Sequence, residues 1–150
     1  MGVARLRSFL RGRSVVALDT SILIYQFEKN PRYFSFSDAV FVWLEQNGNS
    51  AITSTLSMTE LLVPAYRDGD ARRLQHYRGL MITYPRLTLV APDFGIADVA
   101  ARMRADYGLK TPDAIHAATA LQSNVPTFLT NDPVFQRVKE LDALILDDIL

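Results

Sequence analysis

The chain has 150 residues, a length that suits one domain with its own hydrophobic core. It contains no cysteine, which excludes disulfides and thiolate zinc sites. Its 16 Lys and Arg residues are balanced by 16 Asp and Glu residues, so it cannot bind a polyanion by net charge alone. This balance still permits a protein that uses acidic side chains to hold a metal. No apolar run is long enough to span a membrane, and we expect a cytoplasmic protein.

The N-terminal segment is rich in arginine. Residues 1–13 contain four arginines and no acid. The segment lacks the long apolar core and the small-residue cleavage site of a secretory signal. We therefore expect a solvated, partly frayed arm over residues 1–13, followed by a folded domain over residues 14–150.

Apolar runs rich in β-branched residues alternate with helical patterns along the rest of the chain. In chain order, the pattern predicts a strand over 15–18, helices over 21–29 and 37–48, a strand over 51–55, helices over 57–69 and 70–81, a strand over 86–92, helices over 94–108 and 111–124, a strand over 127–130, a short helix over 132–140 and a strand over 143–148. Pro64 should bend or end its helix, and Gly108 should end another. Strands separated by helices predict a single-domain α/β fold, a three-layer αβα sandwich with a mostly parallel central sheet of about five strands.

Four acids stand where a functional site is expected in such a sheet, beyond the carboxyl ends of the strands. Asp19 directly follows the first strand, and Asp132 follows the strand over 127–130. Glu60 lies in the first turn of the helix after 51–55, and Asp113 lies at the start of the helix over 111–124. Taken singly, each acid could simply cap a helix, and Ser57 with Glu60 matches a capping box.

Taken together, the four acids would meet at one edge of the sheet. Like charges about 4 Å apart repel by about 4 kcal/mol at an effective dielectric constant near 20, so a cation is needed to hold them together. Carboxylate oxygens without cysteine or clustered histidine favour Mg²⁺ or Mn²⁺ over zinc. His116 lies three residues after Asp113 and could approach this site, but a histidine on an alanine-rich helix more often makes a local hydrogen bond.

The ordered motifs "LDTS", "LSMTELL", "YGLKTPDAIHAATAL" and "FLTND" resemble those of PIN-domain nucleases, most closely the VapC-type toxins of prokaryotic toxin–antitoxin pairs. The resemblance extends from about Val15 to Phe135. It implies that Asp19, Glu60, Asp113 and Asp132 form a catalytic, metal-binding site, with Ser21 and Thr130 as polar neighbours. The Arg-rich segment before the first strand is not part of the usual family pattern.

The resemblance also implies a function: endonucleolytic, Mg²⁺- or Mn²⁺-dependent hydrolysis of RNA by the toxin of a type II toxin–antitoxin pair. A small antitoxin is then the expected partner. The aromatic run "YQFEKNPRYFSF" could line a groove for that partner or a homodimer face, and we expect a homodimer. RNA contacts are expected from Arg72, Arg73 and Arg78, although scattered charges of this kind also suit a solvated helix face.

Other functions fit the sequence less well. A phosphotransferase of the haloacid-dehalogenase kind needs a second acid two residues after Asp19, where this chain has Ser21. A nucleotide-binding module would need a glycine-rich phosphate loop, which is missing. Two alternatives remain open: a non-catalytic PIN-like domain that binds RNA or protein, with its acids used only as caps, and a structure-specific DNA nuclease.

Overall fold

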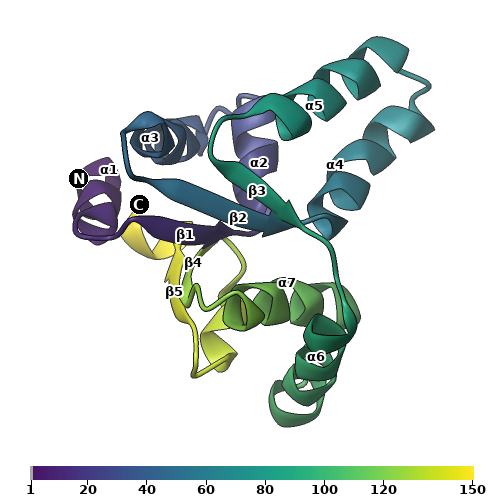
Figure 1. Ribbon diagram of the computed structural model, residues 1–150. Helices are drawn as coiled ribbons and strands as arrows, with labels where there is room; N and C mark the ends of the chain where they lie inside the picture. Colours follow the sequence, from purple (N-terminus) through teal and green to yellow (C-terminus); the bar gives the residue numbers. More distant parts are fainter. Residues whose placement is uncertain (1) are drawn as a thin grey trace.

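The computed structural model describes residues 2–150, and a five-stranded parallel sheet forms its centre (Figure 1). The strands are β1 (Val15–Leu18), β2 (Ser50–Ser54), β3 (Leu87–Val90), β4 (Thr127–Thr130) and β5 (Asp142–Ile145). Their order across the sheet is β3-β2-β1-β4-β5, and all four neighbouring pairs are parallel. The predicted α/β sandwich with a parallel sheet is confirmed.

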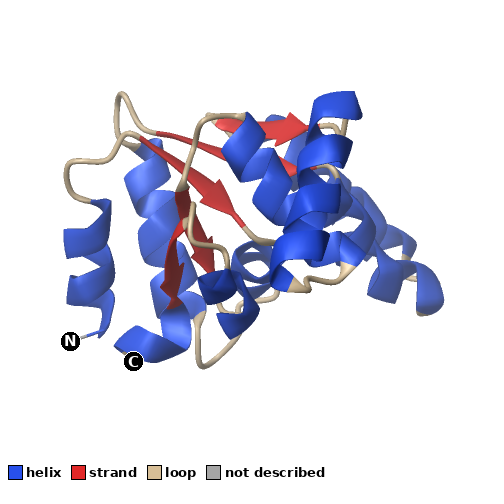
Figure 2. Ribbon diagram, turned by 90° about the horizontal axis from the view of Figure 1, so that it is seen from below, coloured by secondary structure: helices blue, strands red, loops and turns tan. Residues whose placement is uncertain are grey.

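Helices cover both faces of the sheet (Figures 1 and 2). One face carries α1 (Gly2–Leu10), α2 (Thr20–Phe27), α3 (Phe34–Glu45), α4 (Leu56–Arg67) and α5 (Ala71–Thr83), and the other carries α6 (Phe94–Tyr107) and α7 (Thr111–Gln122). Two short 3₁₀ helices, η1 (Pro133–Arg137) and η2 (Leu146–Ile149), flank β5.

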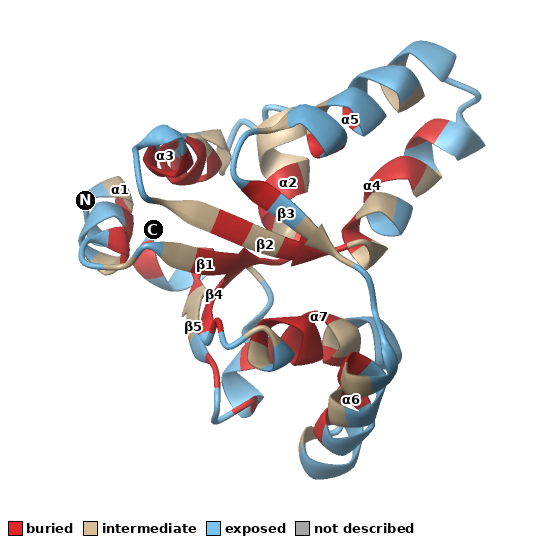
Figure 3. Cartoon of the chain, viewed as in Figure 1, coloured by how far each residue is buried: buried red, intermediate tan, exposed pale blue. Residues whose placement is uncertain are grey.

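The core is divided into two clusters by the sheet. Val16 and Leu18 of β1 face the larger cluster, under α1 to α5, whereas Ala17 faces the smaller one, under α6 and α7. This alternation buries both faces of β1, as expected for the central strand of a parallel sheet. Figure 3 shows the central strands mostly buried and the outer sides of α5 and α6 exposed. The aromatic run predicted to form a partner groove contributes Tyr25, Phe27 and Tyr33 to the edge of the larger cluster.

The N-terminal segment is not the frayed arm predicted from its arginines. Residues 2–10 form α1, whose Leu6 and Leu10 are fully buried against the larger core cluster. Apolar residues four positions apart lie on one side of a helix, so this side packs on the domain while the arginines remain at the surface. The helix contacts α3 and η2.

Most predicted element boundaries agree with the structure to within a few residues, and three predictions need correction. Pro64 does not end its helix, which was one of the two outcomes predicted for it, because α4 continues through Pro64 to Arg67. The segment predicted as a helix over 132–140 forms only the 3₁₀ helix η1, and the last predicted strand ends at Ile145, where η2 begins. Gly108 ends α6 with a left-handed backbone (φ 68°), as predicted. Within residues 2–150, none of the helices combines the length and apolar character needed to cross a membrane.

Candidate active site

The four acids line one cavity of about 480 Å³ at the carboxyl ends of β1 and β4. The chain leaves β1 toward β2 on one side of the sheet, whereas β4 lies on the other side of β1. The strand order therefore reverses between β1 and β4, and in open α/β sheets ligands bind at such a switch point. The residues lining it are Asp19, Thr20, Ser21, Ile24, Tyr25, Glu60, Asp113, Asn131, Asp132 and Pro133.

Asp19 is held in place by three hydrogen bonds and is 9% exposed. Its Oδ1 accepts from the backbone N–H of Thr20 at 2.8 Å. Its Oδ2 accepts from the hydroxyls of Thr130 at 2.7 Å and Ser21 at 3.1 Å. Those hydroxyls in turn accept from the backbone N–H groups of Asp132 at 3.0 Å and Asn131 at 3.3 Å. The network therefore ties the end of β1 to the end of β4, and it includes both polar neighbours expected from the sequence.

Glu60 is oriented by residues from two other helices. Its Oε1 accepts from Thr20 Oγ1 at 2.9 Å and from His116 Nε2 at 2.6 Å. Burial raises the pKa of Glu60, but the hydrogen bonds and charge of His116, with the Thr20 hydroxyl, outweigh it and lower the pKa overall. His116 is buried, and its Nδ1 has no hydrogen-bond partner within residues 2–150. An ionised carboxylate can only accept, so the 2.6 Å contact requires a hydrogen on Nε2 of His116, and this N–H orients Glu60.

Asp113 lies in the first turn of α7 and is the least supported of the four acids. Its carboxylate accepts no protein hydrogen bond within residues 2–150. Burial raises its pKa, and the negative charges of Asp132, Asp19 and Glu60 raise it further, whereas His116 opposes the shift. The cavity thus concentrates negative charge without a compensating cation among the residues that line it.

The alternative that the acids serve only as helix caps fits two of them. Asp19 caps α2, and Asp132 caps η1 by accepting from the backbone N–H of Val134 at 3.0 Å. Glu60 does not form the predicted capping box, because its oxygen is bound to α2 and α7 instead. Lys110 occupies the N-cap position of α7, three residues before Asp113, and no side chain forms a capping hydrogen bond to that helix. Capping therefore does not explain why Glu60 and Asp113 face the cavity.

The donors suit a hard divalent cation, because they are carboxylate oxygens around a cavity with unbalanced negative charge. Within residues 2–150, however, no three acidic or histidine side chains lie close enough together to hold one ion as they stand. Glu60 is turned toward His116 and Thr20, so binding an ion through three acids requires side chains to move toward one another.

None of the three arginines predicted to contact RNA lines the cavity. Arg73 pairs with Glu28 at 2.5 Å and Asp68 at 3.6 Å, and Arg78 donates to the hydroxyl of Tyr66. Arg72 is exposed on α5. Two of the three therefore have local structural partners.

Sequence reasoning missed two residues of the site. Thr20 donates to Glu60 and lies 3.0 Å from the Ser57 hydroxyl, and Asn131 donates through its Nδ2 to the hydroxyl of Tyr25 at 3.1 Å. Both lie inside motifs that the sequence had already singled out, directly beside the acids. Their position next to strand ends is the one feature that could have identified them.

A family model described as PIN domain matches residues 16–141. The chain belongs to the PIN domain family. This match covers the first four strands except the first residue of β1, ends just before β5, and includes all four acids. Helix α1 lies outside it.

Solved structures share this PIN fold. A chain of VapBC2 from Rickettsia felis, bound to a DNA fragment from its promoter, matches with a TM-score of 0.71 and 19% identity over 87% of this chain and 98% of that one. A toxin–antitoxin complex from Klebsiella pneumoniae matches with a TM-score of 0.65 and 23% identity over 87% and 97%. VapBC-1 from nontypeable Haemophilus influenzae matches with a TM-score of 0.64 and 22% identity over 89% and 98%. No curated protein matches the chain.

Proposed function

We propose that this PIN domain is a metal-dependent endoribonuclease, the toxin of a type II toxin–antitoxin pair, and that it uses Mg²⁺ or Mn²⁺. The observation that carries the proposal is the convergence of Asp19, Glu60, Asp113 and Asp132, from four separate elements, on one cavity. The similarity in fold to chains of toxin–antitoxin complexes supports the toxin assignment.

Asp19 and Asp113 are the proposed direct metal ligands. Asp19 is fixed by its three hydrogen bonds, so it offers a rigid point of attachment. Asp113 has a raised pKa and no protein partner within residues 2–150, so a cation would relieve the burial and repulsion acting on its carboxylate. A bound divalent ion supplies positive charge for the phosphate oxygens and lowers the pKa of water.

Glu60 and Asp132 are proposed to complete the site. His116 and Thr20 keep Glu60 ionised by lowering its pKa, which suits it to accept a proton from, or orient, a water molecule. Asp132 keeps one oxygen on the backbone N–H of Val134, which fixes its direction at the mouth of the cavity. Ser21 and Thr130 act through Asp19 by holding its orientation.

The partners are proposed on the same basis. A small antitoxin is the expected inhibitor, because the chains with this fold come from complexes of toxin with antitoxin. A homodimer remains our expectation for the free chain. Of the three arginines predicted to contact RNA, Arg72 is the strongest remaining candidate, because Arg73 and Arg78 already have protein partners.

The experiment is cleavage of labelled single-stranded RNA by the full chain, with Mg²⁺ or with EDTA, beside single-stranded DNA of the same sequence. Asp113→Asn is the test variant, and Asp98→Asn is its matched control, because Asp98 is exposed on α6 and does not line the cavity. We expect Mg²⁺-dependent internal cuts in RNA that Asp113→Asn loses and Asp98→Asn keeps. Calorimetry with Mn²⁺ measures ion binding independently of cleavage.

Each alternative function gives a different result. Intact RNA under all conditions, together with no Mn²⁺ binding, would leave a non-catalytic domain whose acids serve as caps. Cleavage of DNA in preference to RNA would indicate a DNA nuclease. Cleavage that persists in EDTA and in Asp113→Asn would contradict the proposed site.

A further inference from the structure

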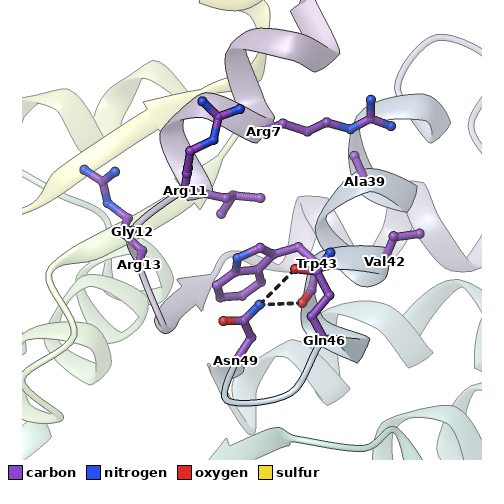
Figure 4. Close-up of a pocket in the computed structure, with 10 residues that line it drawn as sticks. Arg7, Arg11, Gly12, Arg13, Ala39, Val42, Trp43, Gln46 and Asn49 are labelled. Atoms are coloured by element: carbon purple, nitrogen blue, oxygen red, sulfur yellow. Dashed lines mark hydrogen bonds between the residues drawn. The ribbon is translucent and has the colours of Figure 1, made fainter.

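A second cavity, of about 360 Å³, lies away from the acidic site (Figure 4). It is formed by the end of α1, the turn that leads into β1, the end of α3 and the loop before β2. Gly12 and Arg13 precede β1, and Asn49 precedes β2, so the cavity is at the amino ends of these parallel strands. The acids lie at the carboxyl ends, and the two sites share no lining residue.

One side of this cavity is positively charged. Arg7, Arg11 and Arg13 line it, and Arg7 and Arg11 are one helical turn apart. Neither Arg7 nor Arg11 forms an ion pair within residues 2–150. Arg13 is partly neutralised, because its guanidinium binds Asp142 at 2.8 Å and lies over the Phe9 ring. Two guanidinium groups without an ion pair give this hollow a positive charge, which favours an anionic ligand.

The other side offers polar groups around an aromatic ring. Asn49 donates through Nδ2 to the backbone oxygen of Trp43 at 2.8 Å, which leaves its Oδ1 as an acceptor. The indole N–H of Trp43 has no hydrogen-bond partner within residues 2–150 and is not among the fully buried polar atoms. Gln46 adds a second amide to this wall. The wall can therefore both donate to and accept from a polar ligand.

We propose that this cavity binds the phosphate of a nucleotide, either a free mononucleotide or one end of an RNA strand. Guanidinium groups bind phosphate oxygens through paired hydrogen bonds, which suits Arg7 and Arg11 to the phosphate. The amides and the indole N–H suit the sugar or base. A volume of about 360 Å³ lies at the small end of the range for ligand pockets, as expected for one nucleotide. The site goes beyond the proposed ribonuclease activity and does not require it.

The chain itself carries a reporter for this cavity. It contains a single tryptophan, Trp43, which lines the cavity, so its fluorescence reports occupancy directly. We would titrate the full chain in EDTA with AMP, with a short 5′-phosphorylated RNA, with adenosine and with a glutamate-rich peptide. Anisotropy of a labelled copy of the RNA and calorimetry with AMP provide second measurements that do not depend on a fluorescence change.

Arg11→Gln is the test variant, and Arg5→Gln is its matched control. Both remove one exposed positive charge from the same segment, but Arg5 does not line the cavity. We expect AMP or the RNA to change Trp43 fluorescence, and Arg11→Gln to weaken binding about tenfold or more, because a hydrogen bond to a charged group is lost. Arg5→Gln should weaken it less than about twofold.

The remaining outcomes separate the possible ligands. Binding of both AMP and RNA identifies a site for free nucleotides, and binding of RNA alone identifies a strand contact. The proposal is overturned if adenosine binds as well as AMP, if the acidic peptide binds in preference to both, if the two variants lose affinity equally, or if all measurements show no binding. Trp43 does not line the acidic cavity, and EDTA removes any metal from that cavity, so a failure of the ribonuclease proposal would not affect this result.

Discussion

Replacing Asp19 with asparagine should weaken the fold as well as any metal site. The variant keeps one oxygen for the backbone N–H of Thr20, but its amide nitrogen then faces the hydroxyls of Ser21 and Thr130, which donate to Oδ2 in the wild type. Two hydrogen bonds to a charged, 9% exposed group are lost, each contributing about 1.5–3 kcal/mol. Relief of repulsion from the neighbouring acids offsets part of this loss, so we expect a net destabilisation of about 2–4 kcal/mol.

The assay is urea and thermal unfolding in EDTA at neutral pH, followed by circular dichroism. For a domain of this size the loss corresponds to a fall in Tm of roughly 5–15 °C. Asp113→Asn is the matched variant, with the same chemical change at a carboxylate that accepts no protein hydrogen bond within residues 2–150. Its stability should equal or exceed that of the wild type, because burial and neighbouring charges disfavour the ionised carboxylate.

Without metal, Asp113→Asn should be at least as stable as the wild type, and Asp19→Asn should be the least stable of the three proteins. If Asp19→Asn proved as stable as the wild type without metal, charge repulsion would outweigh the hydrogen-bond network at the end of β1. If both variants lost stability equally, Asp113 would have a structural partner that its surroundings do not show. Either result would refute the division into one anchored and one unsupported ligand.

Three further predictions concern stability. Leu6→Ala should cost about 2–5 kcal/mol in urea unfolding, since Leu6 is fully buried, and a loss below about 1 kcal/mol would mean that α1 is not docked. Glu60→Gln should destabilise the metal-free protein at pH 7, and the deficit should shrink as pH falls below 4.5, because His116 and Thr20 lower the pKa of Glu60 from that value; a deficit constant from pH 7 to 3 would contradict this. The raised pKa of Asp113 means that the wild type should lose stability relative to Asp113→Asn as pH rises above 3.8, and equal pH profiles in urea unfolding would count against it.

The sheet and the meeting of the acids could be predicted from the sequence, because both follow from local patterns combined with one rule of topology. Short apolar runs separated by helices require crossovers, and crossovers require parallel strands whose carboxyl ends share an edge. Asp19 and Asp132 directly follow such strands, so their place at that edge needed no knowledge of packing.

The orientation of each acid could not be predicted, because it depends on contacts between distant segments. Glu60 has the sequence of a capping box with Ser57, yet it bonds to Thr20 and His116, 40 and 56 residues away. Those two partners outweigh a local cap. Whether three acids approach closely enough for one ion likewise depends on side-chain conformation, which periodicity does not encode.

Helix α1 was not predicted because the positive charge of its segment indicates a solvated arm, whereas the spacing of its apolar residues indicates a buried helix side. The four arginines suggested a solvated arm, but Leu6 and Leu10 lie on one side of a helix and both are fully buried. The arginines occupy the remaining surface and leave the helix free to pack. A segment can therefore be strongly basic and still be part of the core.

The packing of α1 on η2 brings the two ends of the chain together, as Figure 1 shows. A Cβ atom at Gly2 would lie 2.4 Å from the carbonyl oxygen of Ile149, so the contact leaves no room for a larger residue. During synthesis, α1 is made before the rest of this domain, and it can complete its packing only after residues 146–149 have left the ribosome. A circular permutant that joins the ends by a short linker and opens the exposed turn at Gly69 should keep this contact while removing that delay.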